Sequence, residues 1–83
     1  MIHKAVPVAS VEDEADSLVE KLSSGPTVAL GLIKWLLVSG ATERLEEQLH
    51  HEALALELSS RSNDFREGLA ALKEKRLPRF RGT

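Results

Sequence analysis

The sequence predicts an all-α protein, a bundle of about four helices forming a single helical domain over its 83 residues. Leucine and alanine, which favour helices, are its common apolar residues, whereas aromatic residues make up only 4%. Four apolar or amphipathic segments are separated by Gly, Pro and Ser, which end helices. The absence of cysteine excludes disulfides, thiolate metal ligands and cysteine nucleophiles.

An extended lead-in over residues 1–9 precedes the first predicted helix, over residues 10–24. Ser10 is its predicted N-cap, because the acidic residues at 12–14 favour the positive end of a helix dipole. Apolar residues recur along the segment at helical spacing and form one stripe: Val11, Ala15, Leu18, Val19 and Leu22. The segment therefore predicts an amphipathic helix that Gly25 and Pro26 end.

The second predicted helix, over residues 26–40, is apolar nearly all round, and such a helix must be covered on several sides. Its one charge, Lys34, is expected to lay its stem along the core and bring its ammonium group to water, rather than act as a functional lysine. Because the connecting segments are short, neighbouring helices are expected to pack as hairpins.

The third predicted helix covers residues 42–60, with Thr42 as its cap and a line of apolar residues along one face: Leu45, Leu49, Ala53 and Leu56. The fourth covers residues 62–77 and is capped by Ser62 or Asp64. Gly68 within it costs about 1 kcal/mol relative to Ala, and requires a backbone or ligand passing close by to explain it. Pro78 ends this helix, and residues 78–83 form a short tail.

Charge is unevenly distributed along the chain. Residues 1–60 carry four basic and ten acidic side chains, whereas residues 61–83 carry seven basic and three acidic ones. Two interpretations fit the basic end: cations that stabilise the negative end of a helix dipole, or a localised phosphate site. A pI of about 5.9 and the lack of a recognition motif argue against a nucleic-acid partner.

No metal site, catalytic residue or membrane span is predicted. His50 and His51 are adjacent and point about 100° apart on a helix, whereas a helical zinc pair needs i, i+4 spacing. Glu47 lies four residues before His51, and the two are expected to form a surface ion pair. The longest apolar stretch, residues 28–38, is shorter than the ~20 residues a membrane span needs. With no signal peptide in view, a cytoplasmic location is expected.

In its order of features, almost the whole chain resembles the C-terminal segment of the enoyl-CoA hydratase/isomerase (crotonase) family. The most specific part lies in residues 62–80, which read Ser-Asn-Asp-Phe-Arg-Glu-Gly, then Ala-Leu, then Glu-Lys-Arg, then Pro and Phe. This stretch is similar to the family's closing pattern of Ser-x-Asp-x-x-Glu-Gly, Ala-Phe, Glu-Lys-Arg, Pro and Phe. Val6-Pro7, Gly25-Pro26 and Ala29-Leu30 with Lys34 precede it in the family's order.

The resemblance implies that the chemistry lies on other polypeptide. In the family, a spiral of β-β-α units carries an oxyanion hole of two peptide N–H groups and the carboxylates that move protons. The present residues resemble the helical part that assembles subunits into trimers, often paired as hexamers, and helps to close the acyl-CoA site. The resemblance also implies a CoA contact by Lys75, in Glu74-Lys75-Arg76. Leu72 stands where the family has a phenylalanine, so an aromatic contact to the adenine is lost.

The predicted function is accordingly that of the C-terminal, oligomerisation and CoA-site-closing part of such an enzyme, not catalytic alone. No resident cofactor is expected, since CoA belongs to the substrate, and the expected partners are further copies of the chain and acyl-CoA. The alternative is a stand-alone helical module that docks its apolar second and amphipathic third helices onto a partner protein.

Overall fold

The computed structural model of the chain describes residues 3–83 and contains four α-helices in that part. They are α1 (Val11–Ser23), α2 (Thr27–Gly40), α3 (Leu45–Ser60) and α4 (Asn63–Glu74), with a short 3-10 helix, η1 (Val8–Ser10), ahead of α1. No strand occurs between residues 3 and 83. The predicted all-α class with four helices is therefore confirmed.

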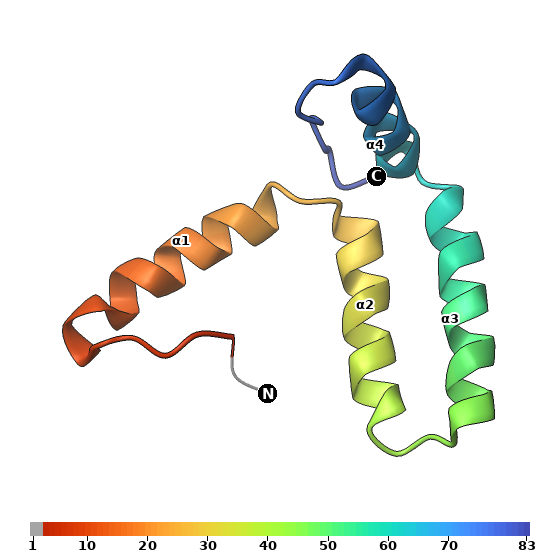
Figure 1. The fold of residues 1–83 in the computed structure, drawn as a ribbon, viewed down its shortest axis with the longest axis horizontal. Coiled ribbons are helices and arrows are strands. Elements are labelled where there is room, and N and C mark those ends of the chain that lie inside the picture. Colours follow the sequence, from red (N-terminus) through yellow and green to blue (C-terminus); the bar gives the residue numbers. More distant parts are fainter. Residues whose placement is uncertain (1–2) are drawn as a thin grey trace.

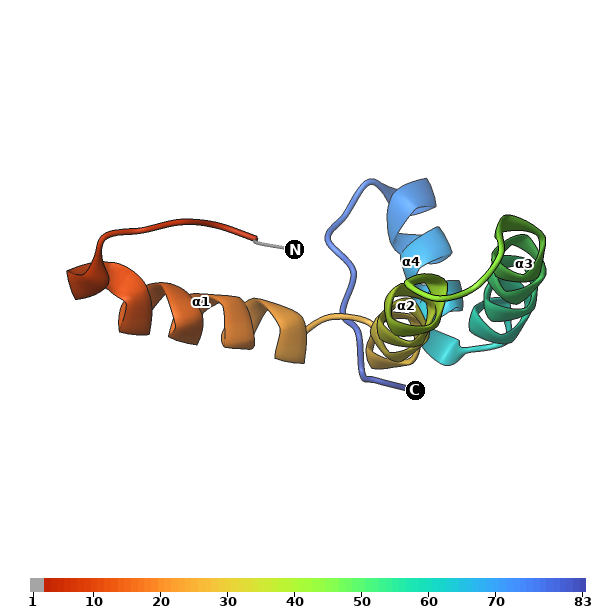
Figure 2. The ribbon, with the colours of Figure 1, turned by 90° about the horizontal axis from the view of Figure 1, so that it is seen from below.

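Two of the helices form a hairpin, and the other two extend from it (Figure 1). Helices α2 and α3 lie antiparallel, α4 follows at one end of this pair, and α1 projects away from it (Figure 2). The segment Val8–Ser23 is bent by 114° from α2 across the break between them. The expectation that all neighbouring helices pack as hairpins is thus wrong for α1 and α2, because the break turns the chain sharply instead of reversing it.

The chain is more open than a compact protein of its size. Its radius of gyration is 15.6 Å, whereas about 12 Å is typical of a compact domain of this length. Its accessible surface is 7152 Å², against about 4,900 Å² for a compact monomer of the same mass. Helix α1 adds to this difference because it projects away from the hairpin (Figure 1).

Few apolar side chains in the described part are buried. Only Ala55 and Ala71 fall in the buried class among hydrophobic residues there. Much of the predicted stripe on α1 and of the apolar body of α2 is exposed, including Val11, Val19, Leu22, Ile33, Leu37 and Val38. The prediction that α2 is covered on several sides is not met within residues 3–83.

Helix boundaries differ from those predicted by three residues at the start of α3 and at the end of α4, and by one residue at four other ends. Ser10 belongs to η1 and makes no side-chain cap bond, so α1 begins at Val11 without it. Helix α3 begins at Leu45 rather than at Thr42, because the Thr42 amide donates to the Ser39 carbonyl at the end of α2. Helix α4 ends at Glu74 rather than at residue 77, because Lys75 adopts a left-handed conformation. Of the predicted lead-in, Met1 and Ile2 lie outside the described residues.

The α2–α3 hairpin is joined by one polar side chain. Gln48 on α3 donates from Nε2 to the Leu36 carbonyl on α2, at 3.3 Å. A Cβ atom on Gly40 would lie 2.9 Å from Gln48 Oε1. The last residue of α2 is therefore small enough to let this glutamine approach the end of the helix.

His51 joins the same hairpin from the next turn of α3. Its ring lies 5.1 Å from that of Trp35, centroid to centroid, and its Nδ1 lies 2.8 Å from Glu43 Oε1. The predicted ion pair between Glu47 and His51 is wrong, because Glu43 contacts His51 from the connection before α3. Between residues 3 and 83, no three His, Cys, Asp or Glu side chains gather to hold a metal ion.

By length and apolar composition, no single helix in residues 3–83 qualifies to cross a membrane. Val8–Ser23 and α2 meet that criterion only when taken together, as a pair bent at their break.

Candidate functional site

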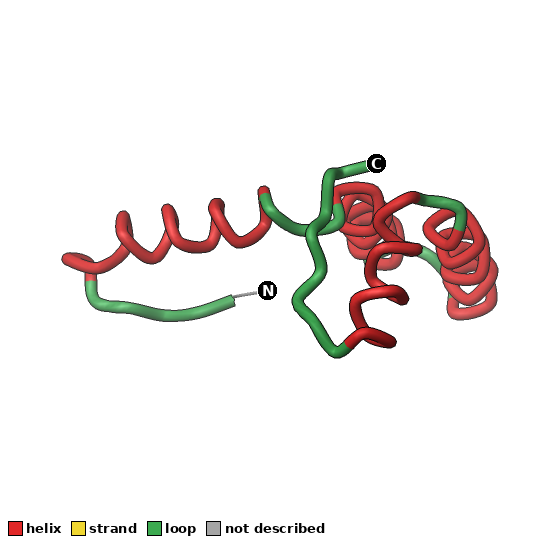
Figure 3. The backbone as a smooth tube through the Cα atoms, turned by 90° about the horizontal axis from the view of Figure 1, so that it is seen from above, coloured by secondary structure: helices red, strands yellow, loops and turns green. Residues whose placement is uncertain are grey.

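The candidate site lies on α4 and on the segment that follows it. Residues 75–83, here called the C-terminal strap, turn back at the end of α4 and run beside it toward its first turn (Figure 3). The sequence predicted only a short tail over residues 78–83. The tail is instead an ordered part of the structure, because acceptors on α4 bind its backbone.

Asp64, in the first turn of α4, anchors the end of the strap. Its side chain accepts hydrogen bonds from the backbone N–H groups of Arg81 at 2.8 Å and Gly82 at 2.7 Å. Only 3% of the residue is exposed, and bonds to an ionised acceptor are strong when they are desolvated. Ser62, rather than Asp64, caps the helix, since its Oγ accepts from the Phe65 amide at 3.1 Å.

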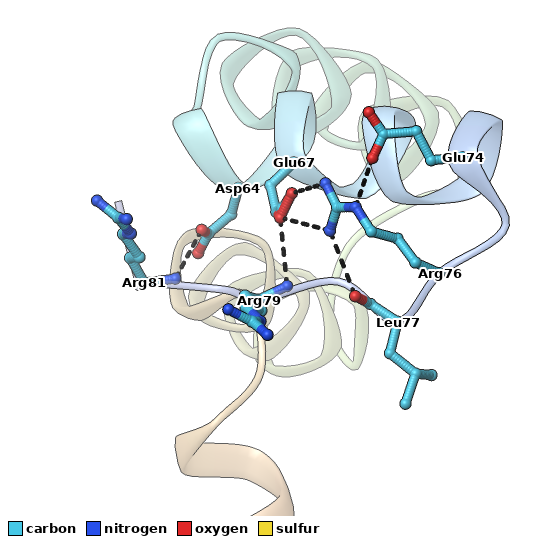
Figure 4. A network of polar contacts seen from close by, with 7 residues as sticks. All are labelled: Asp64, Glu67, Glu74, Arg76, Leu77, Arg79 and Arg81. Atoms are coloured by element: carbon cyan, nitrogen blue, oxygen red, sulfur yellow. Dashed lines mark hydrogen bonds and ion pairs between the residues drawn. The ribbon is translucent and has the colours of Figure 1, made fainter.

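Glu67, one turn further along, binds the beginning of the strap (Figure 4). Its two oxygens accept from the Arg76 guanidinium, Oε1 from Nη2 at 2.6 Å and Oε2 from Nη1 at 3.3 Å. Oε2 also accepts from the Arg79 amide at 3.3 Å. The Arg76 hydrogen bonds, followed by the Arg79 amide, hold the pKa of Glu67 below its ordinary value. The same pairing raises the pKa of Arg76, with Glu74 adding to it.

The middle of the strap lies over Gly68. A Cβ atom built there would be 3.8 Å from Cε1 of the Phe80 ring, so an aromatic side chain passes close to this glycine. Asp64, Glu67, Gly68 and the buried Ala71 follow one another at i, i+3, i+4 and i+7 and therefore share one face of α4. The Asp-x-x-Glu-Gly spacing places two acceptors and a small residue on the face that binds the strap.

Lys75 and Leu72, the two predicted CoA contacts, lie at the end of α4. The Lys75 amide donates to the Leu72 carbonyl at 3.3 Å, which places the two residues one turn apart. Lys75 is exposed, and Leu72 is 78% exposed. Together they present an ammonium group and an apolar side chain to solvent, a combination that suits a ligand with a phosphate and an apolar ring.

The hollow beside the strap does not contain these two residues. It is open, measures about 970 Å³, and is lined by acidic residues of α4 and by strap residues that include Arg76, Arg79 and Arg81. Carboxylates and guanidinium groups of opposite charge share its walls. The predicted site is therefore a surface at the helix end, distinct from this hollow.

The other charged residues singled out in the sequence are not brought together with Lys75. Lys34 lies on α2 and is exposed, as expected of a lysine whose ammonium group reaches water. In the basic end, Arg76 is occupied by Glu67 and Glu74. No ion pair joins Lys73, Arg79 or Arg81 to another side chain of residues 3–83. Arg81 lies beside Asp64 in the first turn of α4, away from Lys75 at the helix end.

A sequence model of the family described as enoyl-CoA hydratase/isomerase matches residues 1–83, the whole chain. The chain belongs to the enoyl-CoA hydratase/isomerase family. The family predicted from residues 62–80 is thereby confirmed, and the alternative of a stand-alone interaction module is not favoured.

Relatives of the chain include enzymes that act on CoA esters. It is 40% identical over 82 residues to 1,2-epoxyphenylacetyl-CoA isomerase of Escherichia coli, covering 99% of this chain and 31% of that protein. A solved enoyl-CoA hydratase from Bacillus anthracis superposes with a TM-score of 0.83 at 36% identity, covering 94% of this chain and 30% of the other. For an enoyl-CoA hydratase from Geobacillus kaustophilus the TM-score is 0.87 at 31% identity, covering 93% and 29%.

The chain spans about a third of the length of these relatives. Its open arrangement of helices, with α1 apart from the hairpin, therefore also occurs within larger enzymes of the family, as the TM-scores indicate.

Proposed function

We propose that this chain is the C-terminal part of an acyl-CoA enzyme of its family, where it closes the CoA site and joins subunits. The observation that carries the proposal is the exposure of Lys75 and Leu72 at the end of α4, where the family resemblance implies CoA contacts. Acyl-CoA thioesters are the proposed substrates of the whole enzyme, in keeping with the names of its relatives.

Lys75 would bind a phosphate of CoA through its ammonium group. A charge-assisted hydrogen bond of this kind contributes about 1.5–3 kcal/mol where solvent is partly excluded. Leu72 would pack against the adenine ring, with an apolar contact in place of aromatic stacking. The chemistry itself would lie outside this chain, so the chain alone is proposed to have no hydratase activity.

The test is the affinity for CoA, measured by calorimetry on the enzyme that contains this chain. Lys75→Ala is expected to weaken binding about tenfold, the effect of losing roughly 1.4 kcal/mol. Lys21→Ala, which removes a lysine of α1, is the matched control and should leave the affinity unchanged. Equal affinities of the Lys75→Ala and unaltered enzymes would refute the CoA contact.

Leu72→Phe tests the apolar half of the site in the same assay. Restoring an aromatic ring should tighten CoA binding about fivefold, because a base stacked on an aromatic side chain gains ~1 kcal/mol or more. The gain should disappear with a pantetheine ligand that lacks the adenosine. A gain that persisted with pantetheine would show that Leu72 does not face the adenine.

The subunit-joining role is supported by the surface that the helices leave uncovered. The chain exposes 7152 Å², roughly 2,200 Å² more than a compact monomer of its mass, and a standard interface covers about 800 Å² on each partner. Sedimentation of the chain at micromolar concentration is expected to show self-association. A compact monomer would contradict this proposal, and hydration of crotonyl-CoA by the chain alone would contradict the division of chemistry.

A further inference from the structure

Lys75 occupies a backbone conformation that usually belongs to glycine. Its φ is 56° and its ψ is 44°, and among residues 3–83 it is the only residue other than glycine with a positive φ. For residues with a Cβ atom this left-handed region is disfavoured, and helices therefore commonly place glycine at this position. Such an outlier persists where surrounding contacts hold it.

The helix end shows the backbone bonds of a Schellman motif. The Arg76 amide donates to the Ala71 carbonyl at 3.0 Å, and the Lys75 amide donates to the Leu72 carbonyl at 3.3 Å. A glycine would make the same two bonds. Backbone bonding alone thus explains the turn but not how a lysine is kept within it.

The additional contact is the side chain of the next residue, Arg76. Because Lys75 is left-handed, the chain turns back and Arg76 lies beside α4, where its guanidinium meets both oxygens of Glu67 (Figure 4). Its Nε also donates to Glu74 Oε2 at 2.5 Å. Glu67 lies two turns before the helix end, and its side chain is only 22% exposed. This two-point pairing links the residue after the turn to the body of the helix.

We infer that Glu67 and Arg76 are positioning residues for Lys75: their two-point ion pair holds Lys75 in the left-handed turn and so aims its ammonium group at the CoA phosphate. The inference rests on the proposed CoA contact of Lys75. Without the pair, residue 75 returns to the conformations that a lysine prefers, its Cα–Cβ bond points elsewhere, and the ammonium group is no longer held over its target.

The test is a double-mutant cycle on CoA affinity in the enzyme that contains this chain. Glu67→Gln keeps the size of the side chain but removes its charge, and it should weaken CoA binding about fourfold, against about tenfold for Lys75→Ala. The double variant should bind no more weakly than Lys75→Ala alone. Glu57→Gln, which breaks the exposed pair with Arg61 on α3, is the matched control and should have no effect.

A second measurement follows the turn itself without CoA. The three-bond coupling between the amide and α protons of residue 75 reports its φ, and it should move from the left-handed value toward an average in Glu67→Gln. Exchanging the two charges, with Glu67→Arg and Arg76→Glu together, should restore both the coupling and the affinity in part. A structural role that did not act through Lys75 would weaken CoA binding equally in the Lys75→Ala background.

The outcomes separate the two proposals. If Lys75→Ala weakens binding but Glu67→Gln leaves it unchanged, or weakens it by the same factor in both backgrounds, the positioning role is overturned and the CoA contact stands. An unchanged φ at residue 75 in Glu67→Gln also overturns the positioning role. If Lys75→Ala has no effect on CoA affinity, the contact itself is refuted.

Discussion

Helix α4 and helix α1 differ in whether their side chains find partners within the chain. The acidic side chains of α4 are hydrogen-bonded to the strap, whereas the apolar side chains of α1 are largely exposed. On α4, Asp64 and Glu67 bind four groups of the strap: three backbone amides and one guanidinium. On α1, the apolar stripe remains largely exposed, with Val19 at 65% and Leu22 at 48%. The acidic groups of α4 are thus satisfied within the chain, whereas the apolar stripe of α1 is not covered.

The difference shows what a short segment can and cannot supply. A carboxylate needs only two or three N–H groups at the right distance, and a single extended strand of backbone provides them. An apolar stripe needs the surface of another helix or sheet to exclude water. Residues 75–83 therefore satisfy the acidic groups of α4, whereas the apolar stripe of α1 stays largely exposed.

The largest expected effect on stability is that of Asp64→Ala. It leaves the Arg81 and Gly82 amides without their acceptor and should lower the free energy of unfolding by about 3 kcal/mol, measured in urea. Amide hydrogen exchange should accelerate at both positions. Asp16→Ala, which removes an exposed carboxylate of α1, is the control and should change stability by less than about 0.5 kcal/mol. A similar loss of stability in both variants would show that the two helices do not differ in this way.

The second effect concerns the end of the strap. Gly82 has a φ of 80°, and a Cβ atom there would lie 3.0 Å from Thr27 Oγ1 at the start of α2. Gly82→Ala should therefore destabilise the protein by about 1–2 kcal/mol in thermal unfolding. By contrast, Gly31→Ala, with no neighbouring atom within 4 Å of the new Cβ, should stabilise α2 by about 0.5–1 kcal/mol. If both substitutions changed the stability in the same direction, the geometry of the strap would be contradicted.

A smaller effect of opposite sign is expected at Lys75. Lys75→Gly relieves the left-handed conformation and should raise the free energy of unfolding by about 1 kcal/mol while it removes the proposed CoA contact. Lys73→Gly, inside the last turn of α4, should lower stability by about the same amount. If Lys75→Gly were destabilising, the left-handed turn would not be strained.

The pH dependence of the strap sharpens the comparison further. Because the pKa of Glu67 is lowered from its ordinary value of 4.5, its carboxylate stabilises the folded state fully above that value and loses this effect as the pH falls through the lowered pKa. The amide resonance of Arg79 should shift in this acidic range, and the step should be missing in Glu67→Gln. Resonances of α2, which contains no acidic residue, should show no matching step.

The smallest effect on stability is expected in α1. Val19→Gln should change the free energy of unfolding by less than about 0.5 kcal/mol, because the side chain is already in water. The same change should weaken self-association in sedimentation by removing apolar surface from an interface. Ala71→Gln on α4, at 1% exposed, is the comparison and should instead unfold the strap. Equal destabilisation by both would mean that α1 is covered within its own chain.

Helical periodicity and the punctuation by Gly and Pro predicted four helices and placed most of their ends within a few residues. The family pattern in residues 62–80 identified the family, while the CoA contacts of Lys75 and Leu72 stay a prediction. These features are local, since one helix face or one turn is enough to reveal them.

The strap and the left-handed turn were beyond this kind of reasoning. Hydrophobic periodicity does not show which backbone amides an acidic side chain binds, so Asp64 was one of two possible caps and Gly68 had no explanation. Lysine at residue 75 gave no turn signal, whereas glycine would have done so. The spacing of Asp64, Glu67 and Gly68 could have predicted the strap, because it places two acidic residues and a glycine on one helix face, ahead of an arginine-rich segment.

The bonds from the strap to Asp64 join residues only 17 and 18 positions apart. Closing so short a loop costs little chain entropy, and folding is fast where contacts are near in sequence. We therefore expect α4 and its strap to form early during refolding, ahead of any docking by α1, with pulse-labelled amides at Arg81 and Gly82 gaining protection first. One end of the molecule, α4 with its strap, would then be folded before α1 packs against any other surface.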